Sequence, residues 1–128
     1  MNSHSYRVLV VDDSRTIRQF VKECFEGEPS KLTFAENGKI ACEKIRSLPD
    51  PGDRYDLILL DWEMPEMTGP ELLDQLNQWG NDTPVIMMTT KNEYSDIEAM
   101  LKKGAREYMM KPFSKEILFE KIERTLKG

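Results

Sequence analysis

Three carboxylates, a hydroxyl and a lysine each follow directly on a short apolar run. Asp12 and Asp13 follow the run 8–11, Asp61 follows 57–60, Thr89 follows 85–88 and Lys111 follows 108–110. Oxygen ligands of this kind suit Mg²⁺, with Mn²⁺ as a substitute. One carboxylate can act as a nucleophile towards phosphorus, and an ammonium group offsets the charge of a phosphoryl group. The set therefore predicts metal-assisted phosphoryl transfer.

The elements that must position these residues alternate between strand and helix. Apolar runs predict strands at 8–11, 31–35, 55–60, 85–88 and 108–110, and amphipathic stretches between them predict helices. This alternation is typical of one parallel sheet covered by helices on both faces. Right-handed crossovers favour the flavodoxin-like strand order 2-1-3-4-5. We therefore expect an α/β fold with a single doubly wound, five-stranded parallel sheet.

The carboxyl ends of parallel strands meet at one edge of the sheet. With this strand order, the ligand crevice opens between the first and third strands. Asp12 and Asp13 end the first of these strands and Asp61 ends the other. The topology thus predicts that the acids straddle the crevice.

The helix patterns also predict which side chains are buried. A fourth helix near 93–103 is expected to bury Ile97, Met100 and Leu101. Ser114 is expected to cap the last helix. The apolar residues that this helix is expected to bury are Ile117, Leu118, Ile122 and Leu126.

Length, charge and hydropathy narrow the class of protein. With 128 residues and 39% hydrophobic content, one core is expected, so residues 1–128 are assigned to a single domain. The net charge of −5 argues against a nucleic-acid partner. No apolar stretch reaches the roughly 20 residues of a membrane span, and residues 1–5 lack a signal-peptide pattern, so a cytoplasmic location without membrane insertion is expected. Cys24 and Cys42 lack metal spacing and are expected to be reduced.

Each site residue taken alone has a simpler structural explanation. An aspartate pair before a helix is usually a cap, and a single aspartate after a strand is usually a turn residue. Taken alone, Lys111 would be a lysine exposed to solvent, and Thr89 would be a β-branched residue at the end of a strand. These explanations weaken jointly, because chance would have to bring all these polar residues to the same edge.

Four segments together resemble the receiver domain of two-component response regulators. They are Val10–Ser14, Asp61–Gly69, Met88–Thr90 and Lys111–Phe113. Each is moderately specific alone, but their order and spacing are very specific, and the resemblance extends from about Tyr6 to Leu126. CheY, a receiver, is a known example of the strand order expected above. The resemblance implies a signalling switch rather than an enzyme, one that assists only its own phosphorylation and dephosphorylation.

The resemblance also implies a role for each site residue. Asp61 matches the phosphoacceptor, which takes its phosphoryl group from a phosphohistidine on a sensor kinase or phosphotransfer protein. Mg²⁺ would be held by Asp13, Asp61 and the backbone carbonyl of Glu63, while Asp12 would act mainly through water. Lys111 matches the lysine that contacts the phosphoryl group, and its peptide bond to proline is expected to be cis.

Thr89 and Tyr108 match the switch pair of the family, in which the hydroxyl moves towards the phosphate and the aromatic ring turns inward. Packing alone also explains Tyr108. The output surface would lie on the fourth helix, the fifth strand and the last helix. Asp61-Trp62 together with Tyr108 looks most like chemotaxis regulators, whose target is the flagellar motor switch.

Glu63 and Lys91 stand two residues after the acceptor and the switch threonine. In the family both positions are variable and influence phosphate lifetime. We hypothesise that their opposite charges meet over the phosphoryl group and hinder an attacking water. The simpler interpretation is that both are solvated and contribute well under ~1 kcal/mol to each other.

Other functions remain open at this point. Within the receiver class, the chain could be a phosphorelay intermediate or a receiver cut from a longer regulator. From the lack of an effector domain after Lys127-Gly128, output through protein contacts is expected. A receiver that has lost phosphorylation is disfavoured, because all the key residues are present. An Mg²⁺-dependent phosphohydrolase would need Asp-x-Asp where the chain has Asp12-Asp13-Ser14. A flavin module would need a hydroxyl- and glycine-rich loop after the first strand.

Overall fold

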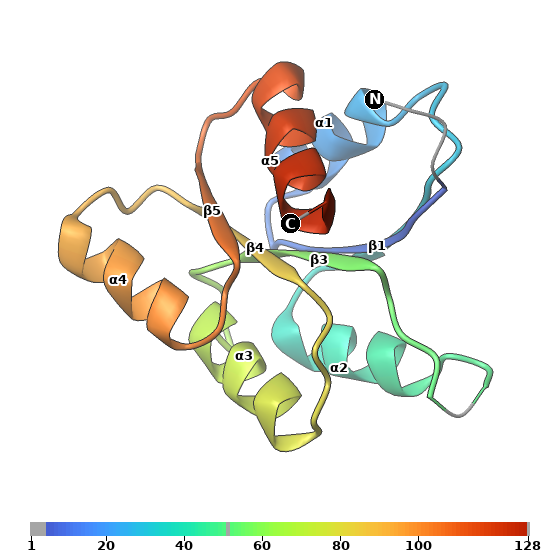
Figure 1. Cartoon of the computed structure of the whole chain (residues 1–128), viewed down its shortest axis with the longest axis horizontal. Coiled ribbons are helices and arrows are strands. Elements are labelled where there is room, and N and C mark those ends of the chain that lie inside the picture. Colours follow the sequence, from blue (N-terminus) through green and yellow to red (C-terminus); the bar gives the residue numbers. More distant parts are fainter. Residues whose placement is uncertain (1–4, 51, 128) are drawn as a thin grey trace.

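Strands and helices alternate along the chain in the computed structural model, which describes residues 5–50 and 52–127 (Figure 1). The elements, in chain order, are β1 Arg7–Val11, α1 Arg15–Cys24, β2 Lys31–Ala35, α2 Gly38–Arg46, β3 Leu57–Asp61, α3 Gly69–Gln78, β4 Val85–Thr89, α4 Tyr94–Lys102, β5 Glu107–Met110 and α5 Lys115–Lys127. Residues 1–5 were predicted to lack a signal-peptide pattern, and of these only Ser5 lies within the described part of the chain. No helix within the described residues is long and apolar enough to cross a membrane.

The five strands form one parallel sheet in the order β2-β1-β3-β4-β5, which confirms the predicted fold class. The register explains why the polar residues meet. Val11 of β1 lies opposite Leu60 of β3, so Asp12 comes level with Asp61. Thr89 pairs with Met110, so Lys111 follows one residue beyond the end of β4.

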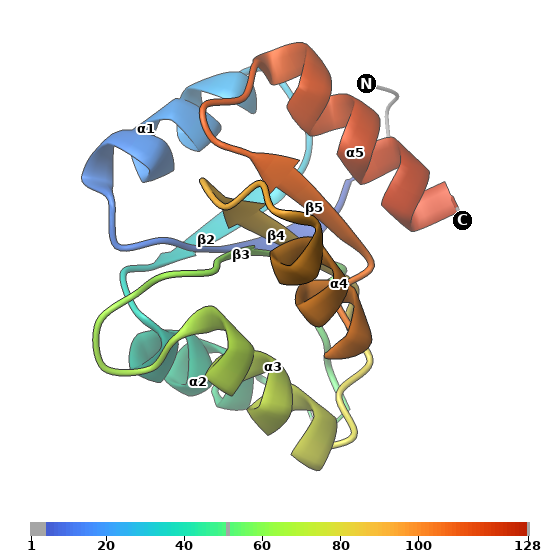
Figure 2. The ribbon, with the colours of Figure 1, turned by 90° about the vertical axis from the view of Figure 1, so that its left-hand side faces the viewer.

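Helices cover both faces of the sheet, α1 and α5 on one and α2, α3 and α4 on the other (Figures 1 and 2). Successive residues of a strand point to opposite faces of the sheet. Because helices bury both faces, the strand residues on both faces are apolar. In β3, for example, Leu57 and Leu59 pack towards α1 and α5, whereas Ile58 and Leu60 pack towards α2 and α3. Burial on both faces explains the continuous apolar runs in the sequence.

Polar caps begin the helices that follow the site loops. The Ser14 hydroxyl accepts a hydrogen bond from the amide of Ile17 at 3.3 Å, which begins α1 directly after Asp13. Ser114 accepts from the amide of Ile117 at 3.1 Å, which confirms the predicted cap of α5. Each hydroxyl satisfies one of the amides that a helix start leaves unpaired.

The prediction that a residue is buried is wrong for two residues. Leu101 in α4 is 45% exposed and Ile117 in α5 is 40% exposed, whereas Met100 is completely buried. Leu101 lies about 100° around the helix from Met100. Because α4 packs beside β5 at the edge of the sheet, its buried face is too narrow to include both.

Candidate functional site

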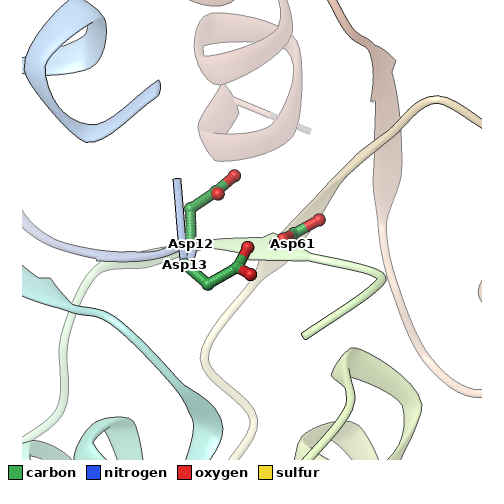
Figure 3. Close-up of side chains that lie close together, drawn as sticks. All are labelled: Asp12, Asp13 and Asp61. Atoms are coloured by element: carbon green, nitrogen blue, oxygen red, sulfur yellow. The ribbon is translucent and has the colours of Figure 1, made fainter. Parts of the chain in front are cut away.

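Three aspartates from two neighbouring strands form an acidic cluster at the carboxyl edge of the sheet (Figure 3). Asp12 and Asp13 follow β1, and Asp61 is the last residue of β3. One carboxylate oxygen from each lies within 4.8 Å of the others. Asp12 is fully buried and Asp61 is 4% exposed, whereas Asp13 is exposed. The structure therefore brings together the acids that the sequence predicted.

Backbone groups hold the two buried carboxylates in place. Asp12 Oδ1 accepts from the amide of Ser14 at 2.8 Å, and Asp61 Oδ1 accepts from the amide of Glu63 at 3.3 Å. The guanidinium of Arg18 donates to the carbonyl of Asp12 at 2.7 Å. The sequence analysis missed Arg18, and its position one turn into the helix after the acids is the signal that could have found it.

Gly69 lets the loop after Asp61 fold back against the end of β3. The amide of Gly69 donates to the carbonyl of Trp62 at 3.1 Å. A Cβ atom at position 69 would lie 2.6 Å from the backbone oxygen of Asp61, closer than real Cβ contacts come. Only glycine fits this approach, so the start of α3 packs directly under the acceptor position.

Lys111 bridges the two buried acids. Its Nζ lies 2.8 Å from Asp12 Oδ2 and 3.1 Å from Asp61 Oδ1. The contact with Asp12 is an ion pair without good hydrogen-bond geometry, and Asp12 Oδ2 has no other partner among the described residues. The amide of Lys111 donates to the carbonyl of Thr89 at 2.8 Å, and the bond to Pro112 is cis, as predicted.

Burial and charge shift the pKa values of Asp61 and Lys111 in the same direction. Burial, followed by the negative charge of Asp12, raises the pKa of Asp61 to about 7, although Lys111 opposes the shift. Burial lowers the pKa of Lys111, but the close contact with the Asp12 carboxylate and the charge of Asp61 outweigh it and raise that pKa above its ordinary value. The site thus holds more negative charge than one ammonium group can balance.

A polar hollow of about 190 Å³ opens in front of the acceptor carboxylate. The residues that line it are Asp13, Asp61, Glu63, Thr89, Thr90 and Lys111. Thr89 is 1% exposed, and its hydroxyl accepts from the amide of Lys91 at 2.9 Å. The structure therefore places the predicted hydroxyl and ammonium groups beside the acids.

Glu63, one of the residues that line this hollow, forms an ion pair with Lys91. The Lys91 ammonium lies 3.3 Å from a carboxylate oxygen of Glu63. The side chain of Glu63 is 63% exposed and that of Lys91 is 39% exposed, so solvent screens the pair. The predicted contact between these two charges therefore exists.

Tyr108 lies away from the hollow and is half-buried in the α2, α3 and α4 layer. The Lys121 ammonium of α5 lies 5.3 Å from the centre of its ring, a cation–π contact. Lys121 also pairs with Glu107 at 3.3 Å. The ring thus has a specific partner on α5, Lys121, that the sequence analysis did not anticipate.

The donor set fits a divalent cation. Clustered carboxylate oxygens, one of them buried with only an ammonium partner, match the hard oxygen ligands of Mg²⁺. A cation here would also relieve the repulsion from Asp12, which after burial is the second cause of the raised pKa of Asp61. Asp12, Asp13 and Asp61 are the side chains placed to hold it.

These features together describe a class of doubly wound α/β domain with an acidic cluster, a threonine and a lysine at the carboxyl edge of its parallel sheet. Within this class, the family model for the response regulator receiver domain matches residues 8–123. The chain belongs to this family, the receiver domains of two-component systems.

Similar proteins agree with this assignment. The response regulator MprA of Mycobacterium ulcerans is 34% identical over 123 residues, which are 96% of this chain and 51% of that protein. The chain thus spans about half the length of the curated relatives it matches. Among solved structures, the receiver domain of Francisella response regulator 1452 is 34% identical, with a TM-score of 0.85 over 96% of this chain and 98% of that one. Chemotaxis protein CheY4 of Vibrio cholerae is 30% identical, with a TM-score of 0.86 over 96% and 100%.

Proposed function

We propose that Asp61 accepts a phosphoryl group from a phosphohistidine on a sensor kinase or phosphotransfer protein in the cytoplasm. The observation that carries this proposal is the hollow in front of Asp61, lined by a lysine and two threonines. An Asp61 oxygen would attack phosphorus as the bond from phosphorus to the histidine nitrogen breaks. The electron pair of that bond stays on the imidazole.

The chain's own residues would do most of the positioning. Lys111, which pairs with Asp61 Oδ1 before transfer, would contact a phosphoryl oxygen afterwards. The Thr89 hydroxyl donates to no described group and would be free to bond a second oxygen. Asp13, Asp61 and the carbonyl of Glu63 would hold Mg²⁺, with Asp12 acting through water, and the bound ion would supply charge stabilisation for phosphoryl transfer.

Incubation with Mg²⁺ and acetyl phosphate tests this function. Intact-mass spectrometry should show the gain of one phosphoryl group, which Asp61→Asn abolishes and Asp82→Asn, at an exposed acid far from the hollow, retains. Sustained turnover of many phosphate esters would instead indicate a phosphohydrolase. No mass gain in the wild-type chain with magnesium would overturn the proposal.

We further propose that phosphorylation shifts Thr89 and Tyr108 and so changes the surface of α4, β5 and α5. An aspartyl phosphate shifts the equilibrium only by its difference in affinity for the two arrangements. Tyr94 and Leu101 lie on one side of α4, seven residues apart, and are 80% and 45% exposed. Exposed apolar groups of this size suit a protein target.

A chemotaxis output, with the flagellar motor switch as target, is the pathway we favour. It is supported by Asp61-Trp62, by Tyr108 and by the similarity to CheY4 along its whole length. A phosphorelay intermediate or a receiver from a longer regulator is the alternative, and the MprA relatives are about twice as long as this chain. Phosphotransfer profiling against candidate kinases, followed by binding of the phosphorylated chain to motor-switch protein, separates these outputs.

The Glu63–Lys91 pair is proposed to lengthen the phosphate lifetime by obstructing an attacking water. The 3.3 Å ion pair between Lys91 and Glu63, which lines the hollow, supports this role. Glu63→Ala and Lys91→Ala should each speed loss of the phosphoryl group, while Glu98→Ala, in an exposed pair on α4, should not. An unchanged half-life in both variants would end the hypothesis.

A further inference from the structure

The outer edge of β2 offers unpaired backbone groups. The amide of Lys31 donates to the carbonyl of Tyr6, and the carbonyl of Ala35 accepts from the amide of Asp12. In a parallel ladder alternate residues bond to the same neighbour, so the backbone groups of Leu32 and Phe34 point away from β1. Within the described residues no strand pairs with this side of β2. Four amide and carbonyl groups are therefore free to bond an added strand.

Two hollows meet at the outer edge of β2. One extends towards the face of the sheet that α1 covers, and the other towards the face that α2 covers. One, of about 260 Å³, lies between Phe34 and α1, where Arg15, Arg18 and Lys22 line it. The other, also of about 260 Å³, lies between Phe34 and α2, where Lys44 and Ile40 line it. Arg18 and Phe34 line both. Figure 2 shows α1 and α2 on opposite sides of the sheet next to β2.

The charge around this edge is strongly positive in an acidic protein. Arg15, Arg18, Lys22 and Lys44 form no ion pair with any carboxylate in residues 5–50 and 52–127. Glu36 is the one acid among the residues that line the two hollows. The net charge of the chain is −5, so these cations form a local field that opposes the overall one.

We propose that the outer edge of β2 is a docking site for an acidic, extended segment of a partner protein, which adds to the sheet as a further strand. Main-chain hydrogen bonds to Leu32 and Phe34 would supply affinity, and alternate side chains would supply specificity. Side chains on one face of the added strand would meet the cations of α1, and those on the other face would meet Ile40 and Lys44. A second copy of this chain is disfavoured, because pairing β2 with β2 would bring two sets of unpaired cations together.

The first test uses a synthetic peptide of alternating glutamate and valine and the full chain in its isotope-labelled form. Binding should slow hydrogen exchange at the amides of Leu32 and Phe34 and leave those of α4 unchanged. Two further peptides carry N-methyl groups on one or the other alternate set of amides. Only one of these two should retain binding, because an added strand turns one set of amides towards β2. If both bind, if neither binds, or if the parent peptide does not bind, the proposal is overturned.

The second test removes charge without touching the acidic cluster. Arg15→Gln, Lys22→Gln and Lys44→Gln combined should weaken binding about tenfold, with three exposed pairs each contributing about 0.5 kcal/mol. The matched control, Arg106→Gln, Lys115→Gln and Lys127→Gln, removes the same charge elsewhere and should weaken binding less than about twofold. Arg18 is left intact because it holds the carbonyl of Asp12.

Equal losses in the two triple variants, at matched thermal stability, would contradict a local site. Tighter binding of a single-stranded oligonucleotide than of the acidic peptide would indicate a nucleic-acid surface instead. Self-association of the free chain in sedimentation, strengthened by the first triple variant because it removes the repelling cations, would indicate a second copy. Either result would overturn the proposed partner.

Discussion

Replacing Asp61 with asparagine should stabilise the chain at about pH 8 when divalent cations are chelated. Burial and the charge of Asp12 raise the pKa of Asp61 from 3.8 to about 7. A difference of one pKa unit corresponds to about 1.36 kcal/mol, so ionisation of this carboxyl costs the folded state up to about 4 kcal/mol. Because Asp61 faces an open hollow, water relaxes part of this penalty, and we expect about 2 kcal/mol.

The sign of the pH dependence follows from the raised pKa. Between about pH 4 and about pH 7 the folded state holds the Asp61 proton more tightly than the unfolded state does. The contribution of Asp61 to the free energy of unfolding therefore falls as pH rises through this window and is constant above it. Asparagine carries no charge, so the variant should lack this slope.

Urea denaturation of both proteins in chelator, at about pH 5 and about pH 8, measures the effect. The gain in stability of the variant over the wild type should be clearly larger at the higher pH than at the lower, and added Mg²⁺ should stabilise the wild type more than the variant. Asp82→Asn, at an exposed acid, is the control and should change neither value. If the Asp61→Asn variant is no more stable than the wild type at the higher pH, the contributions of burial and charge that we assign to the pKa of Asp61 are refuted.

Three further substitutions test other parts of the structure. Lys111→Met should lower the free energy of unfolding at neutral pH by up to about 3 kcal/mol, because it leaves Asp12 and Asp61 facing each other, and Mg²⁺ should restore part of the loss in the same denaturation assay. Gly69→Ala should cost about 1–3 kcal/mol, since its Cβ would lie 2.6 Å from the Asp61 carbonyl oxygen; a thermal midpoint equal to the wild type's would refute that contact. Met100→Ala should cost about 2–5 kcal/mol but Leu101→Ala under about 0.5, and similar losses in the two would contradict the orientation of α4.

Most residues of the site could be predicted from the sequence, because each strand ends where an apolar run changes to a polar residue. A strand covered on both faces is apolar throughout, so the first charged residue after it marks the edge of the sheet. Asp12, Asp61 and Lys111 are such residues, and all strands are parallel, so their convergence was predictable. Ser114 was predictable for a similar local reason, because a hydroxyl before an apolar helix is the usual cap.

Contacts between distant segments depend on register and packing, which no local pattern encodes. That Lys111 lies between Asp12 and Asp61 follows from the alignment of β4 with β5 and from side-chain packing at the sheet edge. Likewise, the periodicity of α4 marks an apolar side but not its width, so Leu101 was wrongly placed in the core.

The sequence by itself determined the alternation of strands and helices, the parallel sheet and the polar residues that end its strands, because these depend on periodicity and on the chemistry of single positions. Only the tertiary structure decided which charges meet and which stay unpaired. The ion pair of Glu63 with Lys91 and the unpaired cations around β2 both arise where segments distant in sequence approach each other. Coulomb energy depends on distance through space, and that distance exists only once the chain has folded.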